Sequence, residues 1–220
     1  KFRNELPPEV FLKPLQAPMT NGPKGLRENL QRARQLLADA GWSIKDGVLK
    51  NTAGATFSFE ILLSSATFER VMAPYVKNLE KLGMQVRYRT IDPALYEERL
   101  QKFDFDMIVH VYGQSQSPGN EQRNFWHSEA AKQKGSNNYA GIQSPAVDYL
   151  VEKIIYAQNQ EELTAACKAL DRVLWYGFYL VPNWYLDGHR LGFYDKFQKP
   201  ATLPLYYNYI QLLMTWWAKD

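Results

Sequence analysis

The sequence lacks the residue patterns that disulfides, metal sites and nucleotide sites require. Its single cysteine, Cys167, excludes an internal disulfide, and its place in a helical apolar pattern favours a buried, inert thiol. The three histidines, His110, His127 and His189, lie far apart and lack the H-E-x-x-H spacing of a zinc enzyme. No P-loop and no dinucleotide-binding glycine fingerprint is present. We therefore expect no bound metal and no cofactor.

Long hydrophobic runs and charge of one sign are missing as well. No apolar run approaches the ~20 residues that are needed to cross a bilayer. The net charge of +3 arises from 26 basic and 23 acidic residues, which are interleaved along the chain. Nucleic-acid binding needs a concentrated basic face, so no nucleic-acid partner is expected. The chain starts at Lys1 without a charged and then apolar leader, so no export signal is visible.

Alternating helix and strand patterns fill the chain from about residue 26 to residue 181. Apolar residues at helical spacing predict a first helix. Gly41 is expected to end this helix, and Trp42 is expected to pack against its last turn. Asp46-Gly47 predicts a tight turn. We expect it to form a hairpin whose second arm is the strand at 57–63.

The later part of the chain continues this alternation. Pro74 falls inside one predicted helix and is expected to kink it or shift its start. Ser144 and Pro145 suit the first positions of a helix, and Asn159 with Glu162 makes a capping box for another. Strands are predicted at 85–91, 103–109 and 180–186. Helices are predicted at about 67–82, 95–102 and 145–157, and the helix that Asn159 caps carries Cys167. This order predicts an α/β layer with crossover helices.

The two ends of the chain differ from the middle. Residues 1–25 contain several of the 12 prolines and no periodic apolar pattern, so they are expected to be an extended connection. Residues 26–181 are expected to form the α/β lobe. Residues 182–220 are rich in aromatic residues and proline without a period. Such a tail favours packing on another surface, or self-association where that surface is absent.

Several motifs occur in an order that resembles one protein family. The sequence at 36–42 is LLADAGW, and 46–49 is DGVL; 103–109 is FDFDMIV, 137–139 is NNY and 144–148 is SPAVD. This series is similar to the C-terminal lobe of the family 5 extracellular solute-binding proteins, which serve peptide and nickel ABC importers. Two further segments, FERV from Phe68 and NFW from Asn124, look most like the YejA-type oligopeptide-binding members.

The resemblance implies a fold class and a function. The fold would be α/β, namely the C-terminal lobe of a periplasmic binding protein of type II (cluster C). Its mixed sheet would be flanked by helices, with extended crossover segments at both ends. The chain would be part of a longer periplasmic protein, not an enzyme, that binds an oligopeptide between two lobes and delivers it to ABC transporter permease subunits. Residues 182–220 would then pack on the first lobe.

The segment from His110 to Trp126 is the strongest candidate for ligand contact. It follows an apolar strand, and open α/β sheets bind ligands beyond the carboxyl ends of their strands. Uncharged hydrogen-bonding groups beside aromatic rings suit a peptide main chain, whereas a guanidinium suits a terminal carboxylate. Two further polar and aromatic runs lie downstream. The candidate ligand-binding residues are Tyr112, Gln114, Ser115, Gln116, Arg123, Asn137, Asn138, Tyr139, Trp184 and Tyr185.

One departure from the family concerns a carboxylate. In the best-known peptide binders, an acid in the loop after this strand holds the free amino terminus of the peptide. Here the loop from Tyr112 to Pro118 has no carboxylate before Glu121. An unpaired buried ammonium is costly. The loop therefore suits either a peptide whose amino terminus is blocked or an amine that is held from elsewhere.

Two other function classes compete with this interpretation. A hydrolase could use Asp104, Asp106 and Ser115, although Gly113–Ser117 lacks the final glycine of a G-x-S-x-G turn and the two aspartates also suit backbone capping. An interaction module could instead dock a partner protein through its aromatic C-terminus, with Trp216 and Trp217 as anchors. Turnover of a substrate would favour the first class, and loss of a partner without the two tryptophans would favour the second.

Overall fold

The computed structural model describes residues 1–22, 25–115, 117–184, 188, 190–203 and 209–219. The chain divides into two compact units. The first unit consists of residues 1–113 and 118–179, and the second consists of residues 114–117 and 180–220. The two units are described separately below.

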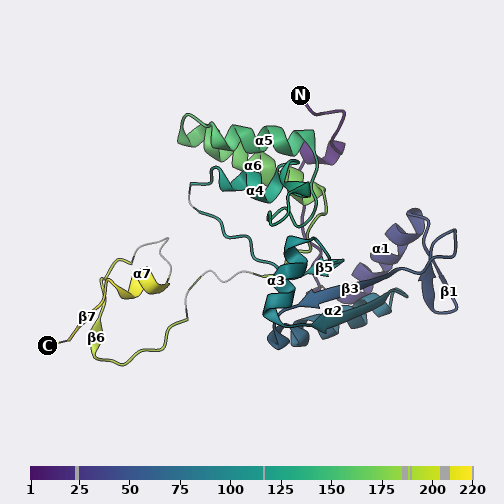
Figure 1. Cartoon of the computed structure of the whole chain (residues 1–220), viewed down its shortest axis with the longest axis horizontal. Coiled ribbons are helices and arrows are strands. Elements are labelled where there is room, and N and C mark those ends of the chain that lie inside the picture. Colours follow the sequence, from purple (N-terminus) through teal and green to yellow (C-terminus); the bar gives the residue numbers. More distant parts are fainter. Residues whose placement is uncertain (23–24, 116, 185–187, 189, 204–208, 220) are drawn as a thin grey trace. The chain divides into compact units, whose positions relative to one another are not determined.

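A three-stranded parallel sheet lies at the centre of the α/β part of the first unit (Figure 1). Strand β3 (Ser58–Leu63) is central, β4 (Gln85–Thr90) pairs with it along its full length, and β5 (Met107–Ile108) pairs on the other side. Helix α2 (Glu69–Glu80) connects β3 to β4, and α3 (Pro93–Gln101) connects β4 to β5. Parallel neighbours require such crossover connections.

Alternate residues of β3 face opposite layers of the core. Ile61 and Leu63 pack with Met72 and Val76 of α2 in one cluster. Leu62 packs with Tyr96 and Leu100 of α3 in another. Since all three β3 residues are at most 1% exposed, the sheet is covered on both faces, as the predicted layer requires.

The first helix and the turn after it follow the sequence prediction. Helix α1 (Gly25–Asp39) ends where expected: Gly41 has φ +84°, and the Trp42 N–H donates to the Leu37 carbonyl at 2.9 Å. Asp46 and Gly47 have φ values of 52° and 79°, as a two-residue hairpin turn of type I′ requires.

The predicted second arm of this hairpin is wrong. The turn joins β1 (Ser43–Lys45) to β2 (Val48–Lys50), which pair antiparallel as a sheet of their own. Residues 58–63 instead form β3, which pairs with β4 and β5. A type I′ turn fixes an immediate return of the chain, and a strand starting ten residues later is too distant to be its partner.

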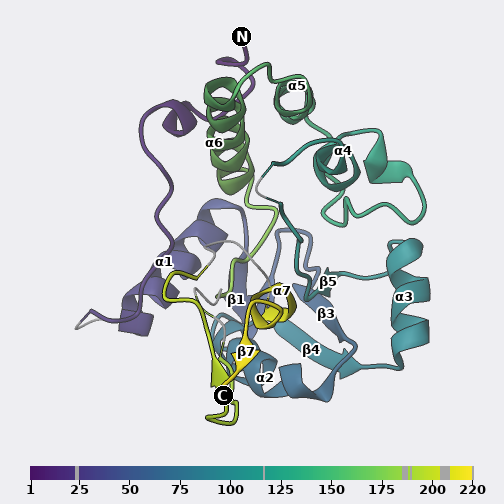
Figure 2. The same cartoon turned by 90° about the vertical axis from the view of Figure 1, so that its left-hand side faces the viewer.

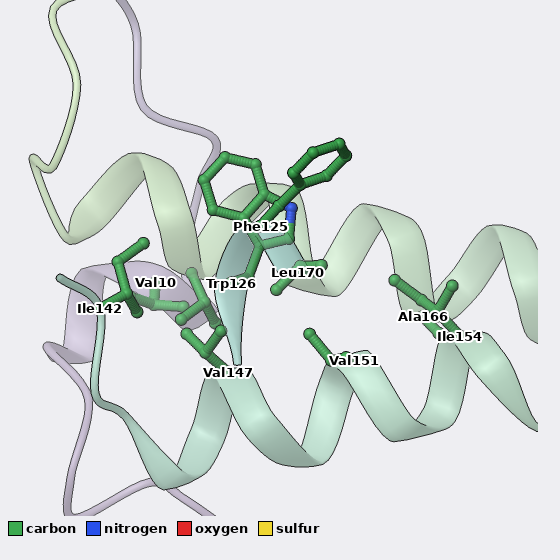
Figure 3. Packing of buried hydrophobic residues seen from close by; sticks show 10 residues of the cluster. Val10, Phe125, Trp126, Ile142, Val147, Val151, Ile154, Ala166 and Leu170 are labelled. Carbon is green, nitrogen blue, oxygen red and sulfur yellow. The ribbon is translucent and has the colours of Figure 1, made fainter. Parts of the chain in front are cut away.

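A helical subdomain completes the first unit. Helices α4 (Glu121–Trp126), α5 (Pro145–Ile155) and α6 (Gln160–Tyr176) lie together in Figure 2. The 3₁₀ helix η1 (Pro8–Phe11) adds Val10 to their core, so the N-terminal segment is anchored there. Figure 3 shows this core. Its buried residues are Val10, Phe125, Trp126, Ile142, Val147, Val151, Ile154, Ala166, Leu170 and Val173.

The predicted cap of α6 is confirmed, because Asn159 accepts the Glu162 N–H at 2.9 Å. Helix α3 starts slightly earlier than predicted, at Pro93, where Asp92 accepts the Ala94 N–H at 2.8 Å. Ser144 precedes Pro145 as expected, but its side chain makes no capping hydrogen bond. The predicted kinking proline, Pro74, lies inside α2, after a short 3₁₀ helix η2 (Ala66–Phe68).

Two predicted strands differ from the structure. The strand expected at 103–109 is reduced to β5, because Phe103 takes φ +54° and the chain pairs with β3 only from Met107 onward. The strand expected at 180–186 is absent from its described residues, 180–184. Residues 185 and 186 lie outside the described part. None of the described helices is long and apolar enough to cross a membrane.

In its described residues, the second unit contains one short helix and one short pair of strands. Helix α7 is Tyr209–Leu213, and β6 (Phe197–Gln198) pairs antiparallel with β7 (Trp217–Ala218). The Phe193 and Trp216 rings meet at 4.6 Å. Large apolar side chains remain exposed in this unit, among them Tyr194, Ile210, Met214 and Trp217.

Candidate functional site

A row of aromatic side chains in edge-to-face contact begins where β5 ends. The His110 ring lies 4.7 Å from the Tyr112 ring and 4.7 Å from the Tyr139 ring, both edge-on. We call these three residues the aromatic row. The Tyr112 ring also lies 4.6 Å from the Trp126 ring. The row therefore joins the end of the sheet to the core of the helical subdomain. The carboxyl end of β5 is thus built from rings supplied by two parts of the first unit.

The environment of the aromatic row keeps its groups uncharged at neutral pH. Burial raises the pKa of Tyr112 to about 12, with a smaller effect from Tyr139, and burial also raises the pKa of Tyr139. Partial burial of the imidazole lowers the pKa of His110, although the residue as a whole is exposed. The row therefore offers ring faces and neutral hydrogen-bonding groups.

Asn137 lies next to this row. The Tyr139 hydroxyl donates to Asn137 Oδ1 at 3.0 Å, and the Asn137 N–H donates to Asn124 Oδ1 at 3.3 Å. Both Asn137 and Tyr139 are half-buried. Three of the predicted ligand-binding residues, Tyr112, Asn137 and Tyr139, are therefore brought into one neighbourhood by the fold.

Asn138 contradicts the prediction that it contacts a ligand. It is 0% exposed. Its Oδ1 accepts the Ile142 N–H at 2.8 Å, and its amide nitrogen donates to the carbonyls of Ile142 at 2.9 Å and His127 at 3.1 Å. A buried amide with these three bonds has little left to offer a ligand. Asn138 instead holds the 137–142 segment against the helical core.

Arg123 is engaged within the helical subdomain. Its Nε and Nη2 donate to the two carboxylate oxygens of Glu152 at 2.7 and 2.6 Å, which joins α4 to α5. This fork raises the pKa of Arg123 and lowers the pKa of Glu152. Arg123 could face a ligand carboxylate, as predicted, only if this pair opened.

The remaining predicted residues lie in the second unit. Gln114 and Ser115 are exposed, and Ser115 Oγ accepts the Ser117 N–H at 3.2 Å. Trp184 is 60% exposed. Gln116 and Tyr185 lie outside the described residues. Their roles as ligand contacts stay predictions.

The acidic residues of the hydrolase alternative make structural bonds. Asp106 Oδ2 accepts the Glu60 N–H at 2.9 Å, which ties β5 to β3. Asp104 accepts from Arg99 Nε at 2.9 Å. Capping of a backbone amide is the role that two aspartates at a strand start commonly have. Within the described ranges, no three His, Cys, Asp or Glu residues are grouped so as to hold a metal ion.

A hollow lies at the other end of the sheet, where β3 and β4 begin. It has a volume of about 770 Å³ and includes the first residues of β3 and β4, together with Gly83 of the turn before β4. Glu60 in its wall pairs with Arg87 at 3.0 Å. Ligands of open α/β sheets bind at the carboxyl ends of the strands, so we do not assign this hollow as the site.

The sequence interpretation missed two residues beside this row. His110 marks only the start of the predicted ligand segment, and Glu97 belongs to no sequence motif. The Tyr96 hydroxyl donates to the Val109 carbonyl at 3.2 Å, which places this part of α3 next to His110.

A family model identifies the class of protein. Residues 4–134 match the bacterial extracellular solute-binding proteins, family 5 (middle region). The match covers more than half of the chain. The chain therefore belongs to this family.

Two relatives show which members of the family this chain resembles. The chain is 45% identical over 221 residues to the uncharacterized protein y4wM of Sinorhizobium fredii, covering 100% of this chain and 33% of that protein. It is 40% identical over 207 residues to the probable peptide-binding protein YejA of Agrobacterium fabrum, covering 94% of this chain and 34% of that protein. The predicted likeness to YejA-type members is thus confirmed. The chain spans about a third of the length of these curated relatives.

A solved structure shows the same fold. The oligopeptide-binding protein AppA of Bacillus subtilis, in complex with a nonapeptide, matches with a TM-score of 0.60 and 23% identity. The match covers 68% of this chain and 30% of that protein. The predicted α/β fold class, a binding-protein lobe with a sheet flanked by helices, is confirmed.

Proposed function

We propose that this chain is the C-terminal lobe of a periplasmic binding protein that captures oligopeptides for an ABC importer, and that it is not an enzyme. The observation that carries the proposal is the aromatic row at the carboxyl end of β5, with Asn137 beside it. Rings and neutral donors and acceptors suit a peptide backbone, whose groups must be hydrogen-bonded when buried. Membership of the family and the peptide-binding description of the Agrobacterium relative support it.

Capture would occur by closure of two lobes. Ligand contacts from both walls favour the closed state, and the closed form docks on the permease subunits. On this lobe, the contacts would come from Tyr112, Asn137 and Tyr139, and from Gln114 to Gln116. Trp184 and Tyr185, which lie at the second crossover, would add further ligand contacts. Arg123 would bind the ligand only if its ion pair with Glu152 opens. The lobe alone should bind weakly, because the opposite wall is absent.

The composition of the loop bears on the ligand's amino terminus. Residues 112–118 contain no carboxylate. A peptide whose amino terminus is blocked would fit such a loop directly. A free amine would need an acid from another element.

The ends of the chain would serve the two-lobe architecture. We propose that residues 1–25 connect from the first lobe, that 26–181 form the C-terminal lobe, and that 182–220 return to pack on the first lobe. The exposed apolar side chains of the second unit, such as Ile210, Met214 and Trp217, support this assignment. Without the first lobe, they should drive self-association, and a clean monomer in sedimentation at high concentration would count against it.

The same exposed surface supports a second candidate function, an interaction module. In that case, truncation of Trp216 and Trp217 would abolish binding of a partner protein, and the loop from Tyr112 to Gln116 would be irrelevant. Peptide binding that depends on the loop would exclude this alternative.

The test is a fluorescence titration of the full-length protein that contains this chain. Intrinsic tryptophan emission is followed with pools of free-amine and N-formylated peptides. We expect saturable binding that the double variant Gln114→Ala/Ser115→Ala weakens at least tenfold. Gln31→Ala/Ser43→Ala, which changes exposed residues of α1 and β1, is the matched control and should bind normally. If the folded, ligand-free protein responds to no peptide pool, the proposal is wrong.

A further inference from the structure

The acids closest in sequence to the ligand loop are engaged by the protein itself. Glu121 Oε1 accepts the Gly119 N–H at 2.8 Å and the Gln122 amide at 3.1 Å. Asp106 accepts the Glu60 N–H at 2.9 Å, and Asp104 accepts from Arg99 Nε at 2.9 Å. An amine of the ligand could compete with these bonds only at the expense of the loop and helix geometry that they hold.

Glu97 differs from these acids because it is exposed and its carboxylate has no partner within the protein's described residues. Within the described part of the chain, it makes no hydrogen bond and no ion pair. Its helical neighbour Glu98 pairs with Lys102, and Glu60 on the sheet pairs with Arg87 and Arg89. Glu97 is thus an unpaired acid on α3.

The fold places Glu97 beside the aromatic row. The hydrogen bond from Tyr96 to the Val109 carbonyl fixes this turn of α3 against the end of β5, one residue before His110. The charge of Glu97 acts on the same groups: it raises the pKa of Tyr139 and opposes the lowered pKa of His110, with burial the larger effect in both. The hydrogen bond thus places the α3 turn that carries Glu97 beside the row, and the effect of its charge on these two groups agrees with that position.

A carboxylate beside aromatic rings is a recognition site for an organic cation. The ring faces attract an ammonium group electrostatically, and the carboxylate supplies a charge-assisted hydrogen bond. A neutral His110 adds no competing positive charge at pH 7. In a closed cleft, this arrangement would satisfy an amine that the loop cannot.

We propose that Glu97 is the ligand-binding carboxylate of this lobe and that it holds a cationic amino group of the peptide next to His110 and Tyr139. The inference rests on the proposed peptide-binding function and specifies its ligand. The acid is supplied by α3 instead of the loop. The lobe then selects peptides with a free amine over peptides that are blocked and carry no other cation.

The test compares matched peptides on the full-length protein. One peptide without lysine or arginine is prepared with a free and with an N-formylated amino terminus. We expect the free form to bind at least tenfold more tightly to the unchanged protein. Glu97→Gln should remove this preference by weakening the free form tenfold or more, with little effect on the formylated form. Glu98→Gln, a change at the next residue of the same helix, which is also exposed, is the control and should retain the preference.

Each result has a defined meaning. Equal binding of the two forms to the unchanged protein, or a preference that survives in Glu97→Gln, would overturn the inference and leave the peptide-binding proposal intact. Failure of both forms and of the peptide pools would instead overturn the proposed function. An N-formylated peptide with one lysine separates the two sources of the amine. Its tight binding, lost in Glu97→Gln, would assign the site to a side-chain ammonium and support the inference.

Discussion

Removal of the Asn138 side chain should destabilise the first unit strongly. Asn138→Ala deletes three hydrogen bonds and leaves the Ile142 N–H and the carbonyls of Ile142 and His127 without their partner in the core. Each net bond contributes about 1 kcal/mol, and stranded buried groups add to the cost. We therefore expect a loss of about 3–4 kcal/mol, a large part of the ~5–15 kcal/mol that typically stabilises a domain.

Urea unfolding monitored by circular dichroism measures this loss. With a slope of about 2 kcal/mol per molar urea, the midpoint should fall by roughly 1.5–2 M. Asn137→Ala is the control, because its side chain accepts one bond from Tyr139 in a half-buried position and should cost about 1 kcal/mol or less. A loss below about 1 kcal/mol in Asn138→Ala, or equal losses in both variants, would refute the structural role given to Asn138.

Three further perturbations test local parts of the account. Gly83→Ala should destabilise more than Gly135→Ala in thermal unfolding: both glycines have positive φ, but a Cβ at Gly83 would lie 2.9 Å from the Leu49 nitrogen, whereas nothing lies within 4 Å at Gly135. Arg123→Gln should lower stability at neutral pH, and the difference should vanish as the pH falls below the ordinary carboxyl pKa of about 4.3, because Arg123 lowers the pKa of Glu152 in the folded state. Binding of a free-amine peptide should weaken as acid protonates His110, since an imidazolium beside Glu97 competes with the ligand; His110→Asn should flatten this pH profile in a titration series.

Local chemistry explains why much of the fold could be predicted from the sequence. The Gly41-Trp42 helix end and the Asp46-Gly47 turn depend on backbone conformations that few other residues adopt, so they were predicted correctly. The hairpin partner was not, because the three residues of β2 are too few to show a period. β5 was predicted too long because the register with β3 decides where pairing starts.

The candidate site could be predicted only in part, because some of its contacts join residues that are far apart in the sequence. Tyr112 and Tyr139 could be found as aromatic residues in polar surroundings near a strand end. The pair of Arg123 with Glu152 spans 29 positions, and no local pattern announces it. Glu97 gains its significance from the hydrogen bond between α3 and Val109, which only the folded chain contains.

Calorimetric titration of the full-length, ligand-free protein tests the central claim most directly. The protein is unfolded and refolded to remove bound ligand, and then titrated with an oligopeptide pool and, separately, with an oligosaccharide pool as a non-peptide control. The account predicts saturable heat with the peptides and none with the sugars. Saturable binding of the sugars without any binding of peptides would contradict it.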